Sequence, residues 1–510
     1  MTITKQGRTS SPNPYPLDGI ERGGDGVLRY TILPPSIVAM LRTRADADPA
    51  AEAIVEVGGA RLTYRELWDA AARVAGGLRA SGVAGGDRVA IRLPNGADWV
   101  VAFFGCLLAG AVAVPVNTRF SEHEVDHVVA DSGASVVIST GTPLPAGTPF
   151  AFEDGRSSDL AAIFYTSGTT GFPKGAMLPH SCFLATCENR VRVTGTAGEP
   201  ALRNLVSVPL FHVTGCCSQL MFTLWCGGTT VIMPAFSVQP FLHALVDERI
   251  NIATSVPAIW WLAINQPNFA SFDTRGLRHL SYGGAPMAPE LVGRVRSAFP
   301  NAHLGNGFGL TETTAIATFL PDAWCASRPE TVGFPAPVTE VDLFEPDPAT
   351  GVGELLVRGQ NVVDGYWNAP ERTAETFVDG WLHTGDLARI DADGFVQIVD
   401  RLKDMVNRGG ENVYCVEVEN ALVQHPDVFE VAVLGVPDPM MGEKVGAVIV
   451  PRPGSALSGA AIRSWALEQI ADFKVPQFVV VRDEPLPRNP GGKVLKPTLR
   501  ETIEWGDQLR

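Results

Sequence analysis

The sequence predicts an α/β protein in which a large N-terminal domain is followed by a small α+β domain. The chain has 510 residues, too many for one ordinary hydrophobic core. Between about residues 60 and 335, buried-strand segments alternate with helical segments, which is typical of parallel sheets covered by helices on both faces. After residue 335 strands and turns predominate, and after Asp400 short strands and helices mix.

Individual elements follow from local patterns. Leu62–Gly82 has the periodicity of an amphipathic helix with Thr63 near its start, and residues 87–93 form a short strand after a Gly-Gly turn. Further buried strands are predicted at 135–139, 161–167, 204–210, 251–257 and 279–284. In the C-terminal third, the sequence predicts strands at 353–359 and 395–400. After Asp400, a helix at about 460–470 and the segments 417–426, 430–438, 445–451 and 477–485 indicate a small α+β unit.

Two uncharged stretches, Trp99–Val116 and Leu210–Pro234, have nearly the length of a membrane span. Each is interrupted by glycine, at Gly110 and at Gly227. Before the glycine the residues suit a buried helix, and after it come β-formers. Helix, glycine cap and buried strand is therefore the predicted arrangement, and no transmembrane segment is expected.

Composition excludes several classes of protein. Hydrophobic residues make up 45% and charged residues 19% of the chain, which is globular and not disordered. The net charge of −15 argues against nucleic acid as a partner, because phosphate binding requires a basic surface. The eight cysteines form no C-x-x-C pair, and the N-terminus has no signal-peptide core, so we expect a reduced, cytoplasmic protein.

The segment Tyr165–Gly175, YTSGTTGFPKG, carries the strongest chemical signal. It follows a buried strand and combines hydroxyls, glycines and Lys174, so it offers backbone N–H groups, hydroxyl donors and a cation to phosphate oxygens. It is not a Walker P-loop, because Lys174 is followed by Gly175 and the spacing of the glycines differs. The sequence therefore predicts a phosphate-binding loop of another kind.

With this loop and further motifs in the expected order, the chain resembles the adenylate-forming superfamily of acyl-CoA synthetases, luciferases and peptide-synthetase adenylation domains. The resemblance runs from about residue 35 to the C-terminus. The further matching motifs are Ser281–Pro286, Gly307–Glu312, Trp381–Asp386, Asp400–Asp404, Gly409–Asn412 and Pro490–Lys493. Phe308 stands where the family more often has tyrosine, which removes a hydroxyl and keeps an aromatic ring.

The resemblance implies a domain organisation and a set of ligands. We expect an N-terminal extension over 1–34, an AMP-binding domain over 35–400 and a mobile C-terminal lid domain over 401–510. The AMP-binding domain is expected to hold two parallel-rich sheets and a small β-barrel-like subdomain. The implied reaction converts a carboxylic acid and Mg²⁺·ATP to an acyl-adenylate and pyrophosphate, and then uses coenzyme A to release AMP. The sequence leaves a homodimer open.

The resemblance also assigns residues to roles. Lys493, Thr166, Glu312 and His212 are implied to be catalytic, and Glu312 is implied to hold Mg²⁺, since that ion prefers hard oxygen ligands. The expected nucleotide and coenzyme contacts are Thr166, Ser167, Gly168, Thr169, Thr170, Lys174, Gly284, Ala285, Pro286, Asn306, Gly307, Phe308, Thr311, Asp386, Arg401, Gly409 and Gly410. Among these, Asp386 is expected to accept hydrogen bonds from ribose hydroxyls. Lys403 occupies the hinge position, about which the C-terminal domain is implied to turn between the two half-reactions.

The acid itself is predicted from the implied pocket. The implied lining is His212, Val213, Trp260, Trp261, Tyr282 and Gly283, together with Gly284 and Phe308. Phe211-His212 stands where amino-acid-activating domains carry Phe-Asp, which argues against an amino acid. No cation is expected there to pair with a second carboxylate, so a diacid is disfavoured. We expect a medium- to long-chain fatty acid, with an aromatic acid as the alternative.

Two other functions compete with this reading. One is an adenylating enzyme that does not use coenzyme A, such as a luciferase-like oxygenase, which thiol-dependent release of AMP would distinguish. The other is a noncatalytic acyl or nucleotide sensor on the same fold. The presence of Lys493, Glu312 and Asp386 in their motifs argues against a sensor.

Overall fold

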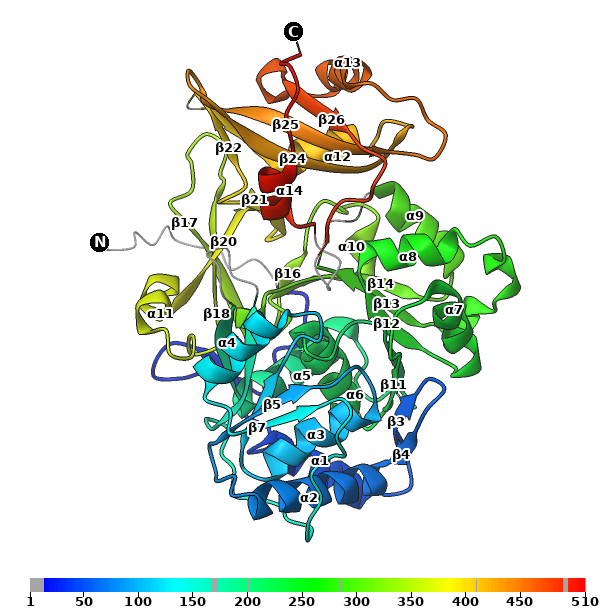
Figure 1. Cartoon of the computed structure of the whole chain (residues 1–510), viewed down its shortest axis with the longest axis vertical. Coiled ribbons are helices and arrows are strands. Elements are labelled where there is room, and N and C mark those ends of the chain that lie inside the picture. The colour runs from blue at the N-terminus through cyan, green and yellow to red at the C-terminus, as the bar shows by residue number, and fades with distance from the viewer. Residues whose placement is uncertain are drawn as a thin grey trace. The chain divides into compact units, whose positions relative to one another are not determined.

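The computed structural model describes residues 13–166, 173–199, 201–284, 287, 289–409, 411–488 and 494–509 (Figure 1). The chain forms two compact units that interleave in sequence. The N-terminal unit comprises Met1–Val341, Val357–His383 and Ala392–Val396, and the C-terminal unit comprises Asp342–Leu356, Thr384–Asp391 and Gln397–Arg510. The domain boundary at 400/401 stays a prediction.

One sheet of the N-terminal unit has five strands, in the order β7-β5-β6-β8-β9. Its strands are β5 (Arg88–Arg92), β6 (Val112–Pro115), β7 (Val136–Ser139), β8 (Leu160–Thr166) and β9 (Lys174–Pro179). All neighbours are parallel except β8 and β9, which are antiparallel. Thr166 at the end of β8 pairs with Lys174 at the start of β9, so this pair fixes both ends of the predicted phosphate loop.

The second sheet has nine strands, in the order β16-β15-β14-β13-β12-β10-β11-β3-β4. They are β3 (Glu52–Glu56), β4 (Arg61–Thr63), β10 (Arg203–Val206), β11 (Thr229–Ile232), β12 (Ile252–Ser255), β13 (His279–Gly283), β14 (His303–Phe308), β15 (Thr318–Leu320) and β16 (Phe334–Pro335). Strands β3 and β10 to β14 pair in parallel, and the outer strands are antiparallel. In a parallel array the carboxyl ends of the strands share one edge, where ligands bind.

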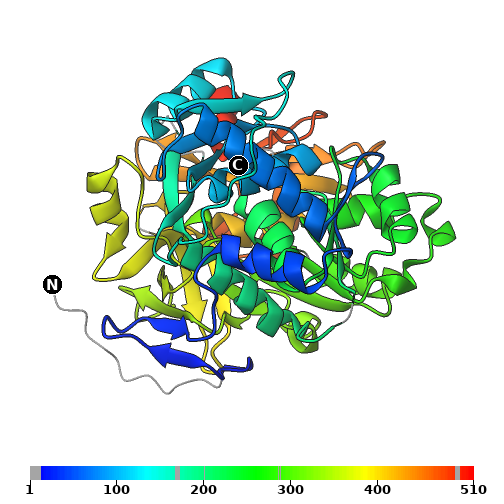
Figure 2. The ribbon, with the colours of Figure 1, turned by 90° about the horizontal axis from the view of Figure 1, so that it is seen from below.

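Helices surround these sheets, and Figures 1 and 2 both show the blue helices α1 to α3 grouped apart from the green helices α7 to α9. Their bounds are α1 (Ile37–Ala47), α2 (Tyr64–Ala80), α3 (Ala97–Leu108), α4 (Glu122–Ser132), α5 (His180–Thr194), the π-helical turns η1 (Thr214–Met221), α6 (Phe222–Trp225), α7 (Val238–Asp247), α8 (Pro257–Ile264) and α9 (Pro289–Ala298). Two parallel-rich sheets covered by helices confirm the predicted fold class.

Local sequence signals explain several of these elements. Helix α2 begins at the predicted position, because Thr63 accepts a hydrogen bond from Glu66 N–H and the Glu66 carboxylate accepts one from Thr63 N–H. Gly110 ends α3 with φ of +76°, and the strand β6 follows as predicted. Within the described residues, no helix is long and apolar enough to cross a membrane.

The strand predicted at 204–210 ends earlier than expected. Strand β10 stops at Val206, and the chain then turns toward His212. The side chain of Asn95 stabilises this turn, since its Nδ2 donates to Val208 O at 2.9 Å and its Oδ1 accepts from Leu210 N–H at 2.8 Å. An apolar run alone cannot reveal that an amide from a distant loop satisfies its backbone.

A third sheet of five strands has the order β17-β18-β20-β19, with β21 paired to β20. Its strands are β17 (Thr339–Phe344), β18 (Gly353–Gly359), β19 (Phe377–Val378), β20 (Trp381–Ile390) and β21 (Val396–Arg401). The short helix α11 (Pro370–Thr376) precedes β19. This sheet corresponds to the predicted barrel-like subdomain, although the boundary between the two units passes through its strands.

The rest of the C-terminal unit has an α+β architecture, as predicted. Its elements are β22 (Val406–Arg408), β23 (Glu411–Val413), α12 (Cys415–Leu422), β24 (Val428–Asp438), β25 (Gly442–Pro451), α13 (Gly459–Gln469), β26 (Phe478–Val481) and α14 (Lys496–Thr502). The long strands β24 and β25 pair antiparallel, and β25 also pairs with β22 and β26. A separate apolar core that includes Val406, Val433 and Ile462 lies within this unit.

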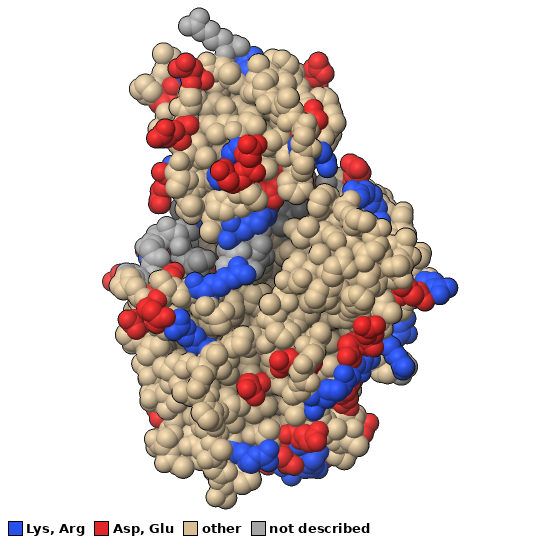
Figure 3. Space-filling model, turned by 45° about the vertical axis from the view of Figure 1, so that its right-hand side comes forward, with Lys and Arg blue, Asp and Glu red and all other residues tan. Residues whose placement is uncertain are grey.

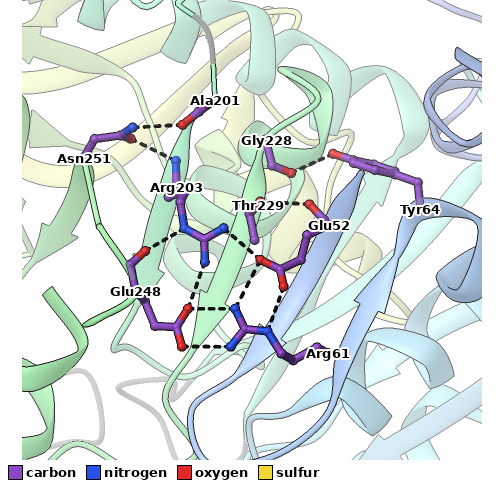
Figure 4. A network of polar contacts seen from close by, with 9 residues as sticks. All are labelled: Glu52, Arg61, Tyr64, Ala201, Arg203, Gly228, Thr229, Glu248 and Asn251. Atoms are coloured by element: carbon purple, nitrogen blue, oxygen red, sulfur yellow. Dashed lines mark hydrogen bonds and ion pairs between the residues drawn. The ribbon is translucent and has the colours of Figure 1, made fainter. Parts of the chain in front are cut away.

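Four charged side chains form a network of ion pairs at one end of the nine-stranded sheet (Figure 4). They are Glu52, Arg61, Arg203 and Glu248. Arg203 on β10 lies 2.8 Å from a Glu52 oxygen and 2.9 Å from a Glu248 oxygen. Arg61 on β4 contacts the same two carboxylates, at 2.7 Å and 2.9 Å. The alternating charges link β3, β4, β10 and the end of α7.

The surface carries charges of both signs (Figure 3), and most of the cysteines are buried, as expected for a globular protein. On the face drawn in Figure 3, acidic and basic side chains are interspersed. The eight cysteines are free thiols, and all of them except Cys226 are buried. Burial raises the pKa of the Cys106 and Cys182 thiols, so these side chains behave as small apolar groups.

Candidate active site

Lys174 and Glu312 meet at a tyrosine that the sequence analysis did not single out. The Lys174 ammonium donates to the Tyr366 hydroxyl at 2.9 Å, and this hydroxyl donates to the Glu312 carboxylate at 2.5 Å. The ammonium and the carboxylate are 4.0 Å apart, and the ammonium lies 4.2 Å from the centre of the tyrosine ring. The structure therefore brings together the loop lysine and the expected metal ligand.

The backbone around Tyr366 runs alongside β9 and fixes the tyrosine. Met177 N–H donates to Gly365 O at 3.0 Å, and Trp367 N–H donates to Gly175 O at 2.7 Å. These bonds flank a β-bridge between Ala176 and Tyr366. The only sequence signal for this segment is an aromatic pair, Tyr366-Trp367, next to a glycine in a loop after β18.

Burial changes the acid–base properties of this cluster. It lowers the pKa of the Lys174 ammonium, an effect that the nearby Glu312 carboxylate opposes. Burial and the Glu312 charge both raise the pKa of the Tyr366 hydroxyl. The tyrosine is consequently a neutral donor at physiological pH, and its proton lies on the side of the carboxylate.

Glu312 lies in a short 3₁₀ turn, Thr311–Thr313, after the end of β14. The next two residues are strained, because Thr314 and Ala315 have φ of +52° and +87°. The buried amide of Asn361 supports the turn by donating to Ile316 O at 2.6 Å and to Thr313 O at 3.2 Å. Strained backbone of this kind concentrates at functional sites.

The chemistry of Glu312 fits a magnesium ion shared with ATP. Its carboxylate supplies hard oxygen atoms, and its side chain is 14% exposed, so it is accessible from one side. Among the described residues, no group of three or more His, Cys, Asp or Glu side chains could hold a metal alone. A single carboxylate is nevertheless the protein contribution expected when phosphates and water provide the remaining ligands.

The ends of β13 and β14 form the predicted nucleotide edge. Gly283 pairs with Gly307, and a Cβ on Gly283 would lie 2.3 Å from Gly307 O, so only glycine allows this approach. Gly284 has φ of +74°, which also favours glycine. Asn306 is buried and donates to Thr331 O at 3.1 Å, whereas Phe308 and Thr311 are partly exposed.

His212 follows the turn that Asn95 stabilises and precedes η1. Its ring lies 4.8 Å from the Phe211 ring, and its Nε2 has no hydrogen-bond partner among the described residues. Burial lowers the pKa of His212 to about 4, so the imidazole is neutral at pH 7. A neutral imidazole with an unpartnered nitrogen can make one directional hydrogen bond to a ligand.

The two predicted pocket tryptophans differ in their surroundings. Trp260 is fully buried and donates to Ser281 O at 3.2 Å, while its ring packs against Phe241 and Phe299 at 5.7 Å and 5.5 Å. Trp261 is partly exposed. Trp260 therefore fills the core between α7, α8 and α9, which makes Trp261 the better candidate for a pocket wall. Val213 and Tyr282 are buried.

In the C-terminal unit, Asp386 on β20 and Arg401 at the end of β21 form an ion pair. Arg401 Nε lies 3.1 Å from Asp386 Oδ1. Thr384 positions this strand, since its hydroxyl donates to Leu355 O at 2.7 Å and accepts from Asp386 N–H at 3.1 Å. The structure thus brings together two of the predicted nucleotide contacts.

Lys403 lies between two anchored carboxylates of the same unit. Asp400 accepts a hydrogen bond from Cys415 N–H, and Asp404 pairs with Arg500 at 2.9 Å. Burial lowers the pKa of the Lys403 ammonium and raises that of Asp400 to about 6. Further along, Gly409 has φ of +63° and its N–H donates to Met441 O at 2.7 Å.

Several predicted site residues lie outside the described residues. They are Ser167, Gly168, Thr169, Thr170, Ala285, Pro286, Gly410 and Lys493. Thr166 is described, and it ends β8 opposite Lys174. The roles of all these residues stay predictions.

The fold and the site define an enzyme that activates carboxylic acids with ATP. Two family models match the chain: AMP-binding enzyme over residues 41–149 and 143–367, and AMP-binding enzyme C-terminal domain over residues 417–493. The chain therefore belongs to the AMP-binding enzyme family. This finding confirms the resemblance drawn from the motifs.

Characterised relatives refine this assignment. A feruloyl-CoA synthase of Amycolatopsis sp is 40% identical over 481 residues, which cover 90% of this chain and 97% of that one. The long-chain-fatty-acid–CoA ligase FadD13 of Mycobacterium tuberculosis is 35% identical over 503 residues, 91% of this chain and 97% of that one. Both are named as CoA-dependent enzymes, and the chain is accordingly an AMP-forming acid–thiol ligase.

Solved structures agree with this fold. The o-succinylbenzoate CoA synthetase of Bacillus subtilis in complex with its acyl-adenylate intermediate has a TM-score of 0.84 at 28% identity, covering 93% of this chain and 99% of that one. A Mycobacterium tuberculosis fatty acyl CoA synthetase has a TM-score of 0.70 at 32% identity, covering 91% and 98%.

Proposed function

We propose that this enzyme activates an aryl-substituted propenoic acid of the feruloyl type and transfers its acyl group to coenzyme A. The observation that carries this choice is the unpartnered Nε2 of the neutral His212, which an apolar chain cannot satisfy and a polar aryl substituent can. The feruloyl-CoA synthase among the relatives supports the same class of acid.

In the first half-reaction, a carboxylate oxygen of the acid attacks the α-phosphorus of ATP and pyrophosphate leaves. Lys174 and the phosphate loop bind the β- and γ-phosphates, and Lys493 stabilises charge at the reacting oxygens. Glu312 would hold Mg²⁺, which neutralises phosphate charge when bound. Asp386 and Arg401 orient the ribose.

In the second half-reaction, the coenzyme A sulfur attacks the acyl carbon as thiolate. The bond from that carbon to the AMP oxygen breaks, and AMP leaves with the electron pair. We propose that the C-terminal domain turns about Lys403 between the steps, and that Gly409-Gly410 then borders the thiol. Gly409 has a left-handed backbone, which favours glycine at this position of the motif.

A panel of carboxylic acids assayed by pyrophosphate release tests the substrate. We expect kcat/KM for ferulate and 4-coumarate to exceed that for octanoate and palmitate. Thiol-dependent release of AMP then distinguishes a CoA ligase from an adenylating enzyme without a thiol step. Lys493→Ala should lower adenylate formation by ~10²–10³-fold and leave thioester formation from synthetic acyl-adenylate nearly normal.

A medium- to long-chain fatty acid is the second candidate. The mostly apolar lining, with Val213 and Tyr282 buried, favours it, and FadD13 supports it. In this case each additional methylene should contribute ~0.8 kcal/mol to kcat/KM until the pocket is full. A cytoplasmic location is part of both proposals, and the free cysteines support it.

A further inference from the structure

We propose that Tyr366 is a positioning residue that keeps Lys174 and Glu312 apart and available for ATP and its metal ion. This inference rests on the proposed function in one respect, because Glu312 is taken as the magnesium ligand. It does not depend on which acid the enzyme uses. The supporting observation is the chain of contacts from ammonium to phenol to carboxylate.

The direction of these hydrogen bonds is fixed by the chemistry of the three groups. An ammonium can only donate and an ionised carboxylate can only accept, whereas a phenol does both. The Tyr366 hydroxyl therefore accepts from Lys174 at 2.9 Å and donates to Glu312 at 2.5 Å. No other residue type of this shape combines one donor, one acceptor and an apolar ring.

The hydroxyl also separates two opposite charges. Lys174 Nζ and Glu312 Oε1 are 4.0 Å apart, which is beyond a direct hydrogen bond. Without the hydroxyl, the flexible lysine could move onto the carboxylate and form a direct ion pair. That pair would compete with phosphate for the lysine and with magnesium for the carboxylate.

The tyrosine itself is held rigidly. Its side chain is 3% exposed, and its ring packs against Phe377 at 5.8 Å. Its N–H donates to Thr373 Oγ1 at 2.9 Å, and its backbone bridges to Ala176 on β9. Because the ring is fixed against β9, which begins at Lys174, its hydroxyl holds the Glu312 side chain at a set position relative to that strand. Such preorganisation reduces the ordering cost at the moment of binding.

Tyr366→Phe tests the proposal because it removes one oxygen atom and keeps the ring. We expect the Mg²⁺ concentration for half-maximal adenylate formation to rise about tenfold, as loss of a charge-assisted hydrogen bond would cause. Binding of a non-hydrolysable ATP analogue without metal should weaken severalfold, because Lys174 is diverted. Mn²⁺ binding in the presence of that analogue, measured by electron paramagnetic resonance, should weaken in parallel.

Two further variants separate positioning from packing. Tyr64→Phe removes another buried tyrosine hydroxyl, which donates to Gly228 O at 2.8 Å, and it should leave all three measurements unchanged. Glu312→Gln provides a double-mutant cycle. If Tyr366 acts through Glu312, adding Tyr366→Phe to Glu312→Gln should have little further effect on Mn²⁺ binding.

Specific results would overturn the proposal. They are an unchanged metal requirement and unchanged analogue binding in a folded Tyr366→Phe variant, or strictly additive effects in the cycle. If Tyr366→Phe does not fold, Lys174→Met and Glu312→Gln still decide the matter, since independent effects on analogue binding would contradict coupling through the tyrosine. Normal metal and analogue binding together with failure of every acid in the panel would instead overturn the proposed function alone.

Discussion

Arg401 pairs with Asp386 in the position expected for a ribose ligand. The two side chains are 3.1 Å apart, and the Asp386 side chain is only 4% exposed while that of Arg401 is 34% exposed. A guanidinium beside a nearly buried carboxylate orients that carboxylate through a charge-assisted hydrogen bond. The ion pair supports the prediction that Asp386 accepts hydrogen bonds from ribose.

Asp386→Asn should raise KM for ATP by about 10–100-fold, because the amide loses charge and one acceptor oxygen, and hydrogen bonds to charged groups contribute ~1.5–3 kcal/mol. Arg401→Lys keeps the positive charge and should raise KM for ATP by a smaller factor. Steady-state kinetics with varied ATP measure both variants. An Asp386→Asn enzyme with a normal KM for ATP and a normal inhibition constant for AMP would show that the pair has only a structural role.

Lys403→Pro should separate the two half-reactions. Proline fixes φ near −65° and restricts the preceding residue, so it limits rotation at the predicted hinge. Pyrophosphate release should continue at close to the normal rate, whereas thioester formation should fall at least ~10-fold if rotation limits it. Lys403→Ala is the control, since it removes the same side chain without restricting the backbone. Equal loss of both half-reactions in the proline variant would argue against a hinge here.

Stability should fall on mild acidification through buried histidines. Ile37 N–H donates to His180 Nδ1 at 3.3 Å, and burial lowers the pKa of His180 to about 4, below the value of about 6.5 in an unfolded chain. Between these values the unfolded chain binds more protons. The contribution of the neutral, buried His180 to the free energy of unfolding is therefore complete above pH ~6.5. It is lost as the pH falls toward 4, by up to ~1.4 kcal/mol per pH unit.

Thermal unfolding between pH 7.5 and 5 measures this effect. His180→Gln provides an acceptor without a titratable ring, so its unfolding midpoint should depend less steeply on pH than that of the natural chain. His243→Gln changes an exposed histidine and should leave the slope unchanged. Identical slopes in the His180→Gln variant and the natural chain would contradict the assignment.

The charge network of Figure 4 predicts unequal effects of two arginine substitutions. Arg203 is 20% exposed and also donates to Glu248 O at 2.6 Å, whereas Arg61 is 50% exposed. Arg203→Met should destabilise the N-terminal unit by ~1–3 kcal/mol, and Arg61→Met by less than ~1 kcal/mol. Urea unfolding followed by tryptophan fluorescence compares them. A larger loss for Arg61→Met would reverse this ranking.

The sequence determined the elements whose signals are local. Thr63 and Glu66 mark the start of α2, Gly110 ends α3, and the apolar runs form β5, β8, β12 and β13 close to their predicted bounds. The motifs determined the family, because their order along the chain requires no knowledge of contacts. These features depend on residues near one another in sequence, where caps, turns and periodicity act directly.

Only the tertiary structure identified the residues that support the site. Tyr366 and Glu312 are far apart in sequence, and so are Asn95 and the turn before His212, or Asn361 and the turn after Glu312. Each contact joins a polar side chain to a group that sequence neighbours cannot satisfy. Trp260 and Trp261 could likewise be distinguished only once α7 to α9 had packed. A buried polar group must find its partner wherever the fold places one, and periodicity carries no information about that choice.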